Sequence, residues 1–557
     1  MLRVGVILDS LHPAAWVAKI IRDIQTSDFA QVQLVLLEQG PAPAASAAGN
    51  PDNPGLSLFR WYERWDYRRN RSHQDSLKPT GISEDIGEAP TVPFRCSKED
   101  RVEHVSGDLL ERMRQMDVVF RFAPCTLSGP VLGAPRYGIW SFRHDLDFTR
   151  RAGKPKGWEA LEQNPVSETV LERLQDPEEA NRIVDRSYAC LERTSLYRSR
   201  NPIYWKSSEI ALRRLRDLAA DGPERVRRSA PHSGLEESPG RAYRRPNNLE
   251  TLLYFVRYVG RWFRVRTSRQ VGPAYKWCIA VRTRSGLRRY DDPEDFRLLV
   301  CPEDRFYADP FLFERDGRTF LFFEDFRYAE GRAVISCCEL GLDGRPVRPF
   351  EVLRLPYHLS YPFVFEDDGE IYMLPETREN RTVELYRATR FPDEWVADTV
   401  LMNDVNVVDS TIHKAAGKYW MFASVSDGKY SNCDELSLFF ADALRGPWLP
   451  HPRNPLLSDV RRARPAGGLF AEDGKLMRPA QDCGKAYGYA LVFAEILKMS
   501  ESEYEERIVS RLNPEVIPHC TATHTYNRTA RFEVVDRNLP PAVARESGTT
   551  FPQDFPL

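Results

Sequence analysis

The sequence predicts a multidomain protein in which an N-terminal α/β domain is followed by an all-β five-bladed propeller. A strand, a helix and a strand open the chain, an arginine-rich stretch interrupts it, and short strands that repeat about every 50 residues fill its second half. We expect the α/β domain over residues 1–212, a linker with a basic amphipathic helix over 213–274, the propeller over 275–540 and a tail over 541–557.

The α/β domain is predicted from the first 37 residues. Residues 3–9 and 32–37 are apolar runs of strand length, and residues 14–24 between them carry apolar side chains at helical spacing. This order is typical of a Rossmann-like parallel sheet. No Gly-Xaa-Gly-Xaa-Xaa-Gly or Walker-type loop follows the first strand, so we predict no dinucleotide, no nucleoside triphosphate and no other cofactor.

The linker is predicted from composition. Apolar residues become sparse between 213 and 240, where Arg, Ser, Pro and Gly accumulate. Residues 249–266 then interleave aromatic and apolar side chains with arginines. We favour a helix that packs between the domains with its arginines reaching into solvent, and a peripheral membrane contact through this segment is the alternative.

The propeller is predicted from four segments that share one plan, a polar or proline-containing corner, a strand, a tight turn and a second aromatic strand. They begin at Asp309, Tyr361, Asp409 and Arg464. Each turn ends in glycine, as in Asp316-Gly317, and such pairs favour hairpins that need positive φ. We expect residues 521–535 to form the fifth blade together with the early strand 277–281, which closes the ring.

Composition excludes several function classes. The 78 basic and 80 acidic side chains give the 557 residues a net charge of -2, which argues against a nucleic-acid partner. No apolar run is long enough for a membrane span, and the N-terminal run is too short for a signal peptide, so we expect a cytoplasmic protein. The ten cysteines are scattered, which favours reduced structural thiols and no metal site; nothing indicates an oligomeric state.

Three blade motifs resemble a known family. Residues 308–311 (Ala-Asp-Pro-Phe), 374–377 (Leu-Pro-Glu-Thr) and 408–411 (Val-Asp-Ser-Thr) resemble the propeller domain at the N-terminus of plant glucosamine inositolphosphorylceramide transferases. That domain is similar to the five-bladed propeller glycosidases of the arabinanase and xylosidase type. The resemblance covers about residues 275–535 and implies a glycan or glycolipid headgroup as the partner.

The N-terminal domain resembles the formyltransferase type more weakly. Residues 137–144 and 151–155 are similar to its His and Arg-Gly-Xaa-Xaa-Pro region, so His144 and Arg151 mark a possible remnant of that site. The asparagine that the family places two residues before the histidine is Phe142 here, and the downstream Asp-Xaa-Gly is missing. We therefore expect a domain that binds no folate.

Glycosyl chemistry requires a carboxylic acid to protonate the leaving oxygen and a carboxylate as base or nucleophile. The resemblance implies the base or nucleophile role for Asp309, and we assign the acid to Glu376 and pKa tuning to Asp409. Each of the three could instead be an ordinary turn or surface residue. Further candidates for contacts to sugar hydroxyls or phosphate are Glu324, Asp325, Arg378, His413, Arg478 and Asp482.

Three functions are compatible with the sequence. The propeller binds or processes a glycan or glycolipid headgroup by glycosidase-type chemistry, or it recognises glycans without catalysis, or the first domain is an active sugar N-formyltransferase. Hydrolysis needs an intact set of axial carboxylates, recognition needs a groove, and formyl transfer needs a folate pocket with a working histidine.

Overall fold

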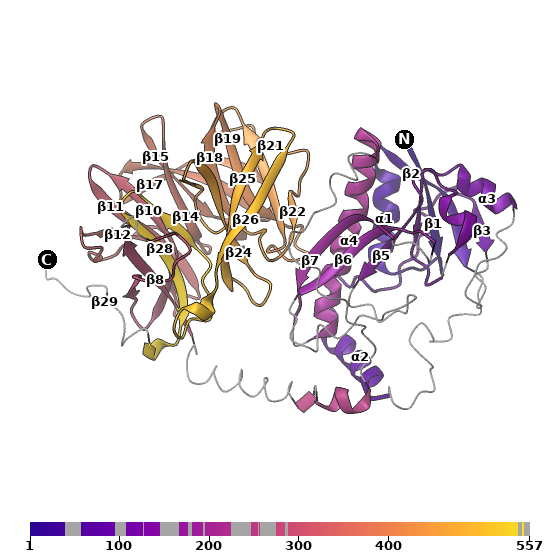
Figure 1. Ribbon diagram of the computed structural model, residues 1–557, viewed down its shortest axis with the longest axis horizontal. Coiled ribbons are helices and arrows are strands. Elements are labelled where there is room, and N and C mark those ends of the chain that lie inside the picture. Colours follow the sequence, from indigo (N-terminus) through magenta and orange to yellow (C-terminus); the bar gives the residue numbers. More distant parts are fainter. Residues whose placement is uncertain are drawn as a thin grey trace. The chain divides into compact units, whose positions relative to one another are not determined.

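A computed structural model describes the chain in two compact units, Met1–Arg261 and Trp262–Leu557 (Figure 1). The described residues are 1–38, 57–94, 107–125, 127–144, 166–176, 181–192, 195–223, 247–253, 255–256, 275–284, 288–543 and 549–550.

The first unit contains a seven-stranded mixed sheet. Its strands are β1 (Leu2–Leu8), β2 (Ala30–Glu38), β3 (Thr91–Phe94), β4 (Val118–Arg121), β5 (Ile139–His144), β6 (Val166–Arg173) and β7 (Arg182–Cys190). They follow the order β3-β2-β1-β4-β5-β6-β7, in which the first five are parallel and the last two antiparallel. The predicted opening strand, helix and strand are β1, α1 and β2; the formyltransferase type of this unit stays a prediction.

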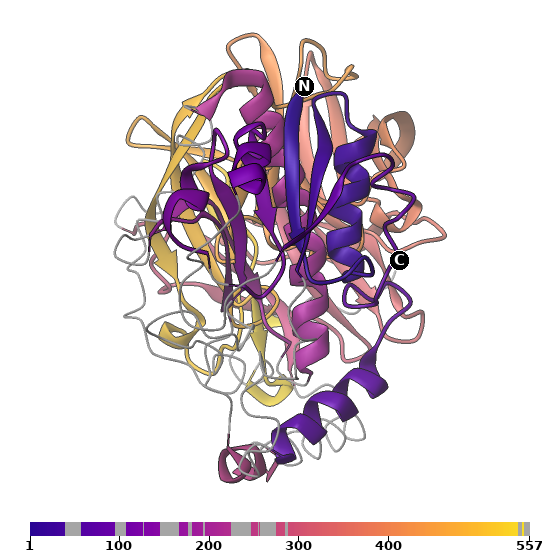
Figure 2. The same ribbon diagram turned by 90° about the vertical axis from the view of Figure 1, so that its right-hand side faces the viewer.

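Helices cover both faces of this sheet. They are α1 (Ala15–Thr26), α2 (Ser57–Asn70), α3 (Gly107–Arg114) and α4 (Leu196–Asp221), with a 3-10 turn at Gly129–Gly133. Alternation along β1 sends Val4 and Val6 into a core shared with α1 and α4, which run side by side, and Ile7 into a core shared with α3 (Figure 2). Within the described residues, no helix has the length and apolar character to cross a membrane.

Helix α4 extends into the segment that composition assigns to the linker. Residues 213–221 form its last turns, and Leu215 and Leu218 are buried there. One of the arginines that suggested a solvated linker is paired and buried instead, since Arg214 lies 2.9 Å from both Asp185 and Asp217. Residues 224–246, the rest of the predicted flexible stretch, lie outside the described residues.

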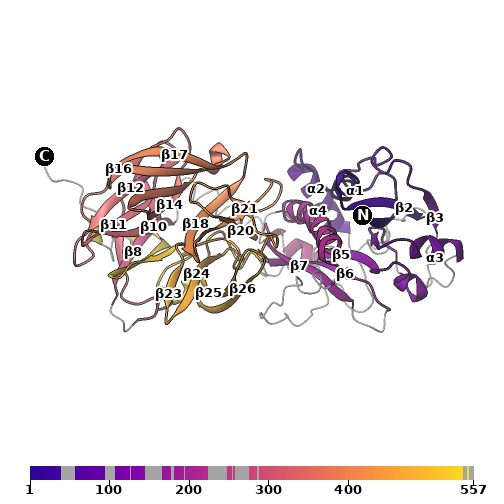
Figure 3. The same ribbon diagram turned by 90° about the horizontal axis from the view of Figure 1, so that it is seen from above.

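The second unit is a five-bladed β-propeller, as predicted (Figure 3). The first four blades are antiparallel sheets, and the first strand of each repeat is innermost. The first blade is β10 (Arg305–Arg315), β11 (Arg318–Arg327), β12 (Arg332–Leu340) and β13 (Phe350–Leu353), and the second is β14 (Ser360–Asp367), β15 (Glu370–Glu376), β16 (Thr382–Arg390) and β17 (Glu394–Asn403). The third is β18 (Val407–Ala415), β19 (Lys418–Val425), β20 (Glu435–Ala441) and β21 (Leu449–Pro450), with β22 (Leu457–Ser458) paired to β20, and the fourth is β23 (Phe470–Glu472), β24 (Lys475–Asp482), β25 (Ala490–Met499) and β26 (Tyr504–Leu512).

The hairpin turns between the first two strands of these four blades are of one kind. Both turn residues have positive φ in each case, for example 51° at Asp316 and 76° at Gly317. The same holds even where alanine occupies the first position, since Ala416 has a φ of 51°. Turns with positive φ at both central residues match the right-handed twist of the strands, which explains why the glycine recurs at the second position.

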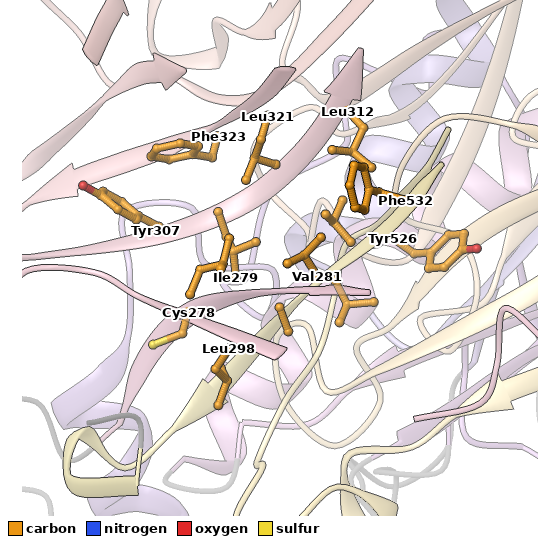
Figure 4. Packing of buried hydrophobic residues seen from close by; sticks show 14 of the residues in the cluster. Cys278, Ile279, Val281, Leu298, Tyr307, Leu312, Leu321, Phe323, Tyr526 and Phe532 are labelled. Carbon is orange, nitrogen blue, oxygen red and sulfur yellow. The ribbon is translucent and has the colours of Figure 1, made fainter. Parts of the chain in front are cut away.

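The fifth blade joins the two ends of the propeller sequence. Its strands are β27 (Tyr526–Arg528), β28 (Phe532–Leu539), β8 (Lys276–Thr283), β9 (Arg297–Val300) and β29 (Thr549–Thr550). Strand β28 pairs antiparallel with β8 over its whole length. The predicted closure by an early strand is therefore confirmed. Figure 4 shows the core beneath this junction, where Ile279 and Val281 pack against side chains of β10, β11, β27 and β28.

Side-chain alternation also explains how the other blades hold together. On β15, Ile371 and Met373 belong to the core shared with the first blade, whereas Tyr372 and Leu374 belong to the core shared with the third. Successive side chains on a strand point to opposite faces, so every central strand supplies both of its neighbours. The aromatic second strands noted in the sequence are thus inter-blade packing surfaces.

We predict that Ile279→Ala lowers the free energy of unfolding of the propeller by about 2 to 5 kcal/mol, because it opens a cavity in the core of the closing blade. Urea unfolding of the full chain measures this. Leu342→Ala is the control, since Leu342 is 80% exposed and should change stability by less than about 0.5 kcal/mol. Equal effects of the two variants would show that the closing blade is not a cooperative part of the ring.

Candidate functional site

The innermost strands share a backbone irregularity at equivalent positions. Asp309, Tyr361 and Asp409 have φ values of 48°, 48° and 53°, and the strand register shifts at each of them. Such bulges re-aim a side chain that would otherwise alternate between the faces of the sheet. Positive φ in non-glycine residues is uncommon, so three equivalent instances indicate that the surrounding contacts fix these side chains.

Contacts of Tyr361 show that these side chains point across the ring. Its hydroxyl lies 2.9 Å from Thr411 Oγ1 of the third blade and accepts a hydrogen bond of 2.6 Å from Gly467 N of the fourth. The second and fourth blades are not neighbours, so this contact passes across the axis. Gly467 has to be glycine, because a Cβ there would lie 2.0 Å from the carbonyl oxygen of Tyr526.

Asp309 belongs to a buried charge cluster between the first and fifth blades. Its Oδ1 accepts a 2.7 Å hydrogen bond from Thr525 Oγ1 and lies 3.3 Å from His524 Nε2, and its Oδ2 accepts one of 3.2 Å from Tyr361 N. His524 Nδ1 lies 2.8 Å from Asp536 Oδ2. An imidazolium thus sits between two carboxylates.

The electrostatics of this cluster favour charged forms. Burial lowers the pKa of His524, but the charges of Asp536 and Asp309 outweigh it and hold that pKa well above its usual value. Burial raises the pKa of Asp309, and its hydrogen bond and ion pair with His524 reverse the sign, so that the pKa is lowered overall. Asp309 is consequently an anion at neutral pH.

Among the described residues, these three side chains form the one group that could hold a metal ion. Ligand atoms of Asp309, His524 and Asp536 lie within 4.8 Å of one another. Two carboxylates and an imidazole form a donor set that divalent cations accept. In the present arrangement both imidazole nitrogens face carboxylate oxygens, so the histidine proton already compensates the negative charge.

Glu376 and Asp409 form a second cluster around Arg464 of the fourth blade. Arg464 Nε lies 2.5 Å from Asp409 Oδ2, and Arg464 Nη2 lies 3.9 Å from Glu376 Oε2. Gln481 Nε2 donates a further hydrogen bond of 2.7 Å to Asp409. Arg464 therefore joins side chains of three blades.

Glu376 is the carboxylic acid of this cluster. Burial and the adjacent negative charge of Asp409 raise the pKa of Glu376 to about 8, although Arg464 opposes the shift. Its Oε2 has no hydrogen-bond partner among the described residues, and its side chain is 11% exposed compared with 3% for Asp409. A proton on Glu376 at neutral pH therefore sits on the more accessible of the two carboxyl groups.

Glu324 connects the two clusters electrostatically. It lies on β11 opposite Ala308, and its Oε1 is 3.5 Å from His358 Nε2. Burial, followed by the charges of Asp309 and Glu376, raises the pKa of Glu324 well above its usual value. The axial site thus contains two neutral carboxylic acids beside the Asp309 anion.

The accessible rim of the site carries an aromatic ring and polar groups. Tyr487 is 51% exposed, and its ring centroid lies 4.9 Å from the Arg464 guanidinium and 5.5 Å from the His524 ring. Arg378 is exposed, and its positive charge lowers the pKa of both Glu376 and His358. These groups are where a ligand would meet the axis.

Four predicted contact residues lie within the blades instead. Asp325 is bonded to Arg305 and Arg327 in the first blade, and Arg478 is bonded through two nitrogens to Glu506 in the fourth. Asp482 accepts hydrogen bonds from Gly484 N and Arg511. His413 stands opposite Trp420 in the β18–β19 hairpin. The first three have protein partners that occupy their charged groups, which weakens the prediction that they contact ligand.

The possible formyltransferase remnant is partly visible. His144 ends β5, is 5% exposed and lies 2.8 Å from Ser207 Oγ through Nε2. Rings of Trp16, Phe142 and Tyr204 surround it. Arg151 lies outside the described residues. The described surroundings of His144 are those of a packed core histidine.

A propeller with acids and ion pairs on its axis is the class of protein that these features define. Comparison with known proteins finds a similar domain: residues 300–535 match the family model for "Glucosamine inositolphosphorylceramide transferase 1, N-terminal". The curated glucosamine inositolphosphorylceramide transferases 1 of Oryza sativa subsp. japonica and Arabidopsis thaliana are 38% and 36% identical over 207 and 205 residues. Each match covers 36% of this chain and 27% of the relative, so the chain spans about a quarter of their length.

The similar solved structures are more distant in sequence. An exo-β-1,3-galactanase from Clostridium thermocellum is 18% identical over 38% of this chain and 52% of its own, with a TM-score of 0.31. The α-L-arabinanase of Cellvibrio cellulosa in complex with arabinohexaose is 16% identical over 36% of this chain and 77% of its own, with a TM-score of 0.28. The assignment of five blades rests on the strand order of the sheets and not on these neighbours.

We predict that Glu376→Gln changes how stability depends on pH. Because the folded-state pKa of about 8 exceeds the ordinary value of 4.5, the folded wild type binds an extra proton between these values, and its free energy of unfolding falls as pH rises from about 5 to 8. Each pKa unit corresponds to about 1.4 kcal/mol. Glutamine carries no such proton, so the variant should lack this fall in urea unfolding; parallel pH profiles would contradict the assignment.

Proposed function

We propose that the propeller binds a glycan or glycolipid headgroup at the axial rim and acts on a glycosidic bond there. The proposal rests on the contrasting surroundings of two carboxyl groups on the axis. Asp309 lies 3.3 Å from His524, which lowers the pKa of Asp309, whereas Glu376 is buried beside Asp409, which raises the pKa of Glu376 to about 8. A pair of carboxyl groups whose pKa values are pushed apart is the arrangement that glycosidic bond cleavage requires.

The roles follow from the surroundings of each group. Glu376 donates its proton to the leaving oxygen as the bond from the anomeric carbon breaks, and Asp309 either takes a proton from the attacking water or attacks the anomeric carbon. Asp409 lies beside Glu376, and its charge raises the pKa of the acid. His524 and Thr525 hold the Asp309 carboxylate in place.

Recognition without turnover is the second candidate, and the burial of the aspartates favours it. Both oxygens of Asp309 and of Asp409 accept hydrogen bonds from protein groups, and their side chains are 6% and 3% exposed. In this alternative the two aspartates hold the blades together while Tyr487 and Arg378 contact the ligand. Measurement of product release from a glycan distinguishes cleavage from recognition without catalysis.

The relatives supply the ligand class to be tested first. The name of these relatives combines an amino sugar, an inositol phosphate and a ceramide. An exposed aromatic ring at the rim suits the apolar face of a sugar, and an exposed guanidinium suits a phosphate. Headgroups with an amino sugar and an inositol phosphate are therefore the first choice among glycans.

We predict that Glu376→Gln lowers the rate of product release from a cleaved glycan by about 100-fold or more, since general acid catalysis contributes on that order. Binding should be retained, because glutamine preserves the shape of the neutral acid. Glu370→Gln is the matched control, as Glu370 lies on the same strand and is exposed. Unchanged turnover in the Glu376 variant would exclude it as the acid. Asp309→Asn is a less clean test, because it breaks a buried ion pair with His524 and should also lower stability.

A separate prediction concerns Arg378. Replacing this exposed side chain by alanine should weaken binding of a phosphate-bearing headgroup by about tenfold, the order expected for loss of one charge-assisted hydrogen bond. The melting temperature should stay within about 1 °C, because the side chain supports no core. Titration calorimetry with inositol phosphate glycans measures this. Arg381→Ala, at the end of the same turn and paired with Asp404, is the control.

A further inference from the structure

A helical segment of the first unit exposes an apolar stripe. Residues 248–253 and 255–256 are helical, and Leu249, Leu252, Leu253 and Val256 in them are 67%, 53%, 53% and 65% exposed. Their spacing of three, four and seven residues places them on one side of the helix. A surface helix of a soluble protein normally turns such a stripe towards the core, so the exposure is unusual.

Another side of the same segment is packed against α2. Asn248 Oδ1 accepts a 3.0 Å hydrogen bond from Leu58 N, and the ring of Phe255 lies 6.0 Å from Trp61 and 5.5 Å from Tyr62. Thr251 is buried on this side. The segment lies next to α2 in both Figure 1 and Figure 2. One side of the helical segment therefore packs against α2, and the apolar stripe lies on a side that remains exposed.

Helix α2 adds an interfacial aromatic residue and positive charge. Trp61 is 51% exposed, and Arg64, Arg68 and Arg69 are exposed on the same helix. No carboxylate of the described residues forms an ion pair with these three arginines. The sequence that follows the segment, residues 257–274, contains five arginines and no acidic residue, although the whole chain has 78 basic and 80 acidic side chains.

We propose that this surface, made of the Leu249, Leu252, Leu253 and Val256 stripe with Trp61 and the arginines of α2, docks on an anionic lipid surface. Exposed aliphatic side chains enter the boundary between headgroups and acyl chains, tryptophan lies at headgroup level, and arginines meet the negative surface potential. A second copy of the chain would bring the same positive charge against itself in a symmetric contact, which disfavours a dimer through this face. The proposal does not depend on what the propeller does to its ligand.

The test is flotation of the full chain with vesicles that contain no glycolipid. The wild type should float with vesicles of phosphatidylcholine and phosphatidylserine, float poorly with phosphatidylcholine alone, and be released by high salt. The double variant Leu252→Glu, Leu253→Glu should lose binding by about tenfold or more, because two carboxylates would enter the interface. The control Leu342→Glu, Val347→Glu changes two exposed aliphatic residues of the propeller and should bind as the wild type does.

A second variant tests charge independently of the stripe. Arg64→Glu, Arg68→Glu should weaken binding to the anionic vesicles by about tenfold and leave the melting temperature unchanged, since both side chains are exposed. Absence of binding by the wild type, or equal loss in the control, would overturn the proposal. It would also be overturned if the wild type dimerised in vesicle-free solution and Leu252→Glu, Leu253→Glu abolished the dimer. Binding of soluble glycans by the propeller should be the same in all these variants, so a failure here differs from a failure of the proposed function.

Discussion

The pairing of β28 with β8 is the constraint on which the propeller and its axial site depend. It joins residues 532–539 to residues 276–283 and thereby fixes the fifth blade beside the first. Asp536 lies on β28, His524 and Thr525 immediately precede β27, and all three act on Asp309 of the first blade. If the ring were open, Asp309 would lose the groups that keep it ionised. The closure of the ring and the charge of Asp309 therefore depend on the same strand pairing.

Several ionisable groups lie close together in the buried interior around the axis. Their charges are compensated by ion pairs or avoided by protonation. Asp309 and Asp409 are paired with His524 and Arg464. The nearest basic groups of Glu324 and Glu376 among the described residues are less close, His358 at 3.5 Å and Arg464 at 3.9 Å, and burial together with neighbouring anions favours the protonated forms of both acids. Buried pairs of this kind contribute little net stability, whereas removal of one partner is strongly unfavourable. The division into ion pairs and neutral acids therefore leaves a reactive proton in a folded core.

Much of this could be predicted from sequence, because blade repeats leave a periodic trace. The Asp-Gly turns, the aromatic second strands and the early closing strand determined the number and order of the blades. Asp309 and Asp409 could be singled out because they open equivalent repeats, and Glu376 because it ends a strand. Arg464 and Tyr361 were visible as starts of repeats, but their roles depend on contacts between blades that no local pattern encodes. His524 and Asp536 could not be found, because only ring closure places them beside Asp309. Residues 213–221 belong to helix α4, because composition does not distinguish a paired, buried arginine such as Arg214 from a solvated one.

Glu376 is expected to hold a proton at neutral pH beside an ionised aspartate. Infrared difference spectra between the wild type and Glu376→Gln measure it directly, since a protonated carboxyl group has a C=O stretch that a carboxylate lacks. We expect the wild type to show a carboxylic acid band at pH 7 that is absent from the variant and that disappears with a midpoint near the pKa of about 8. A band that is already lost near the ordinary pKa of 4.5 would contradict it and would leave the propeller without its acid.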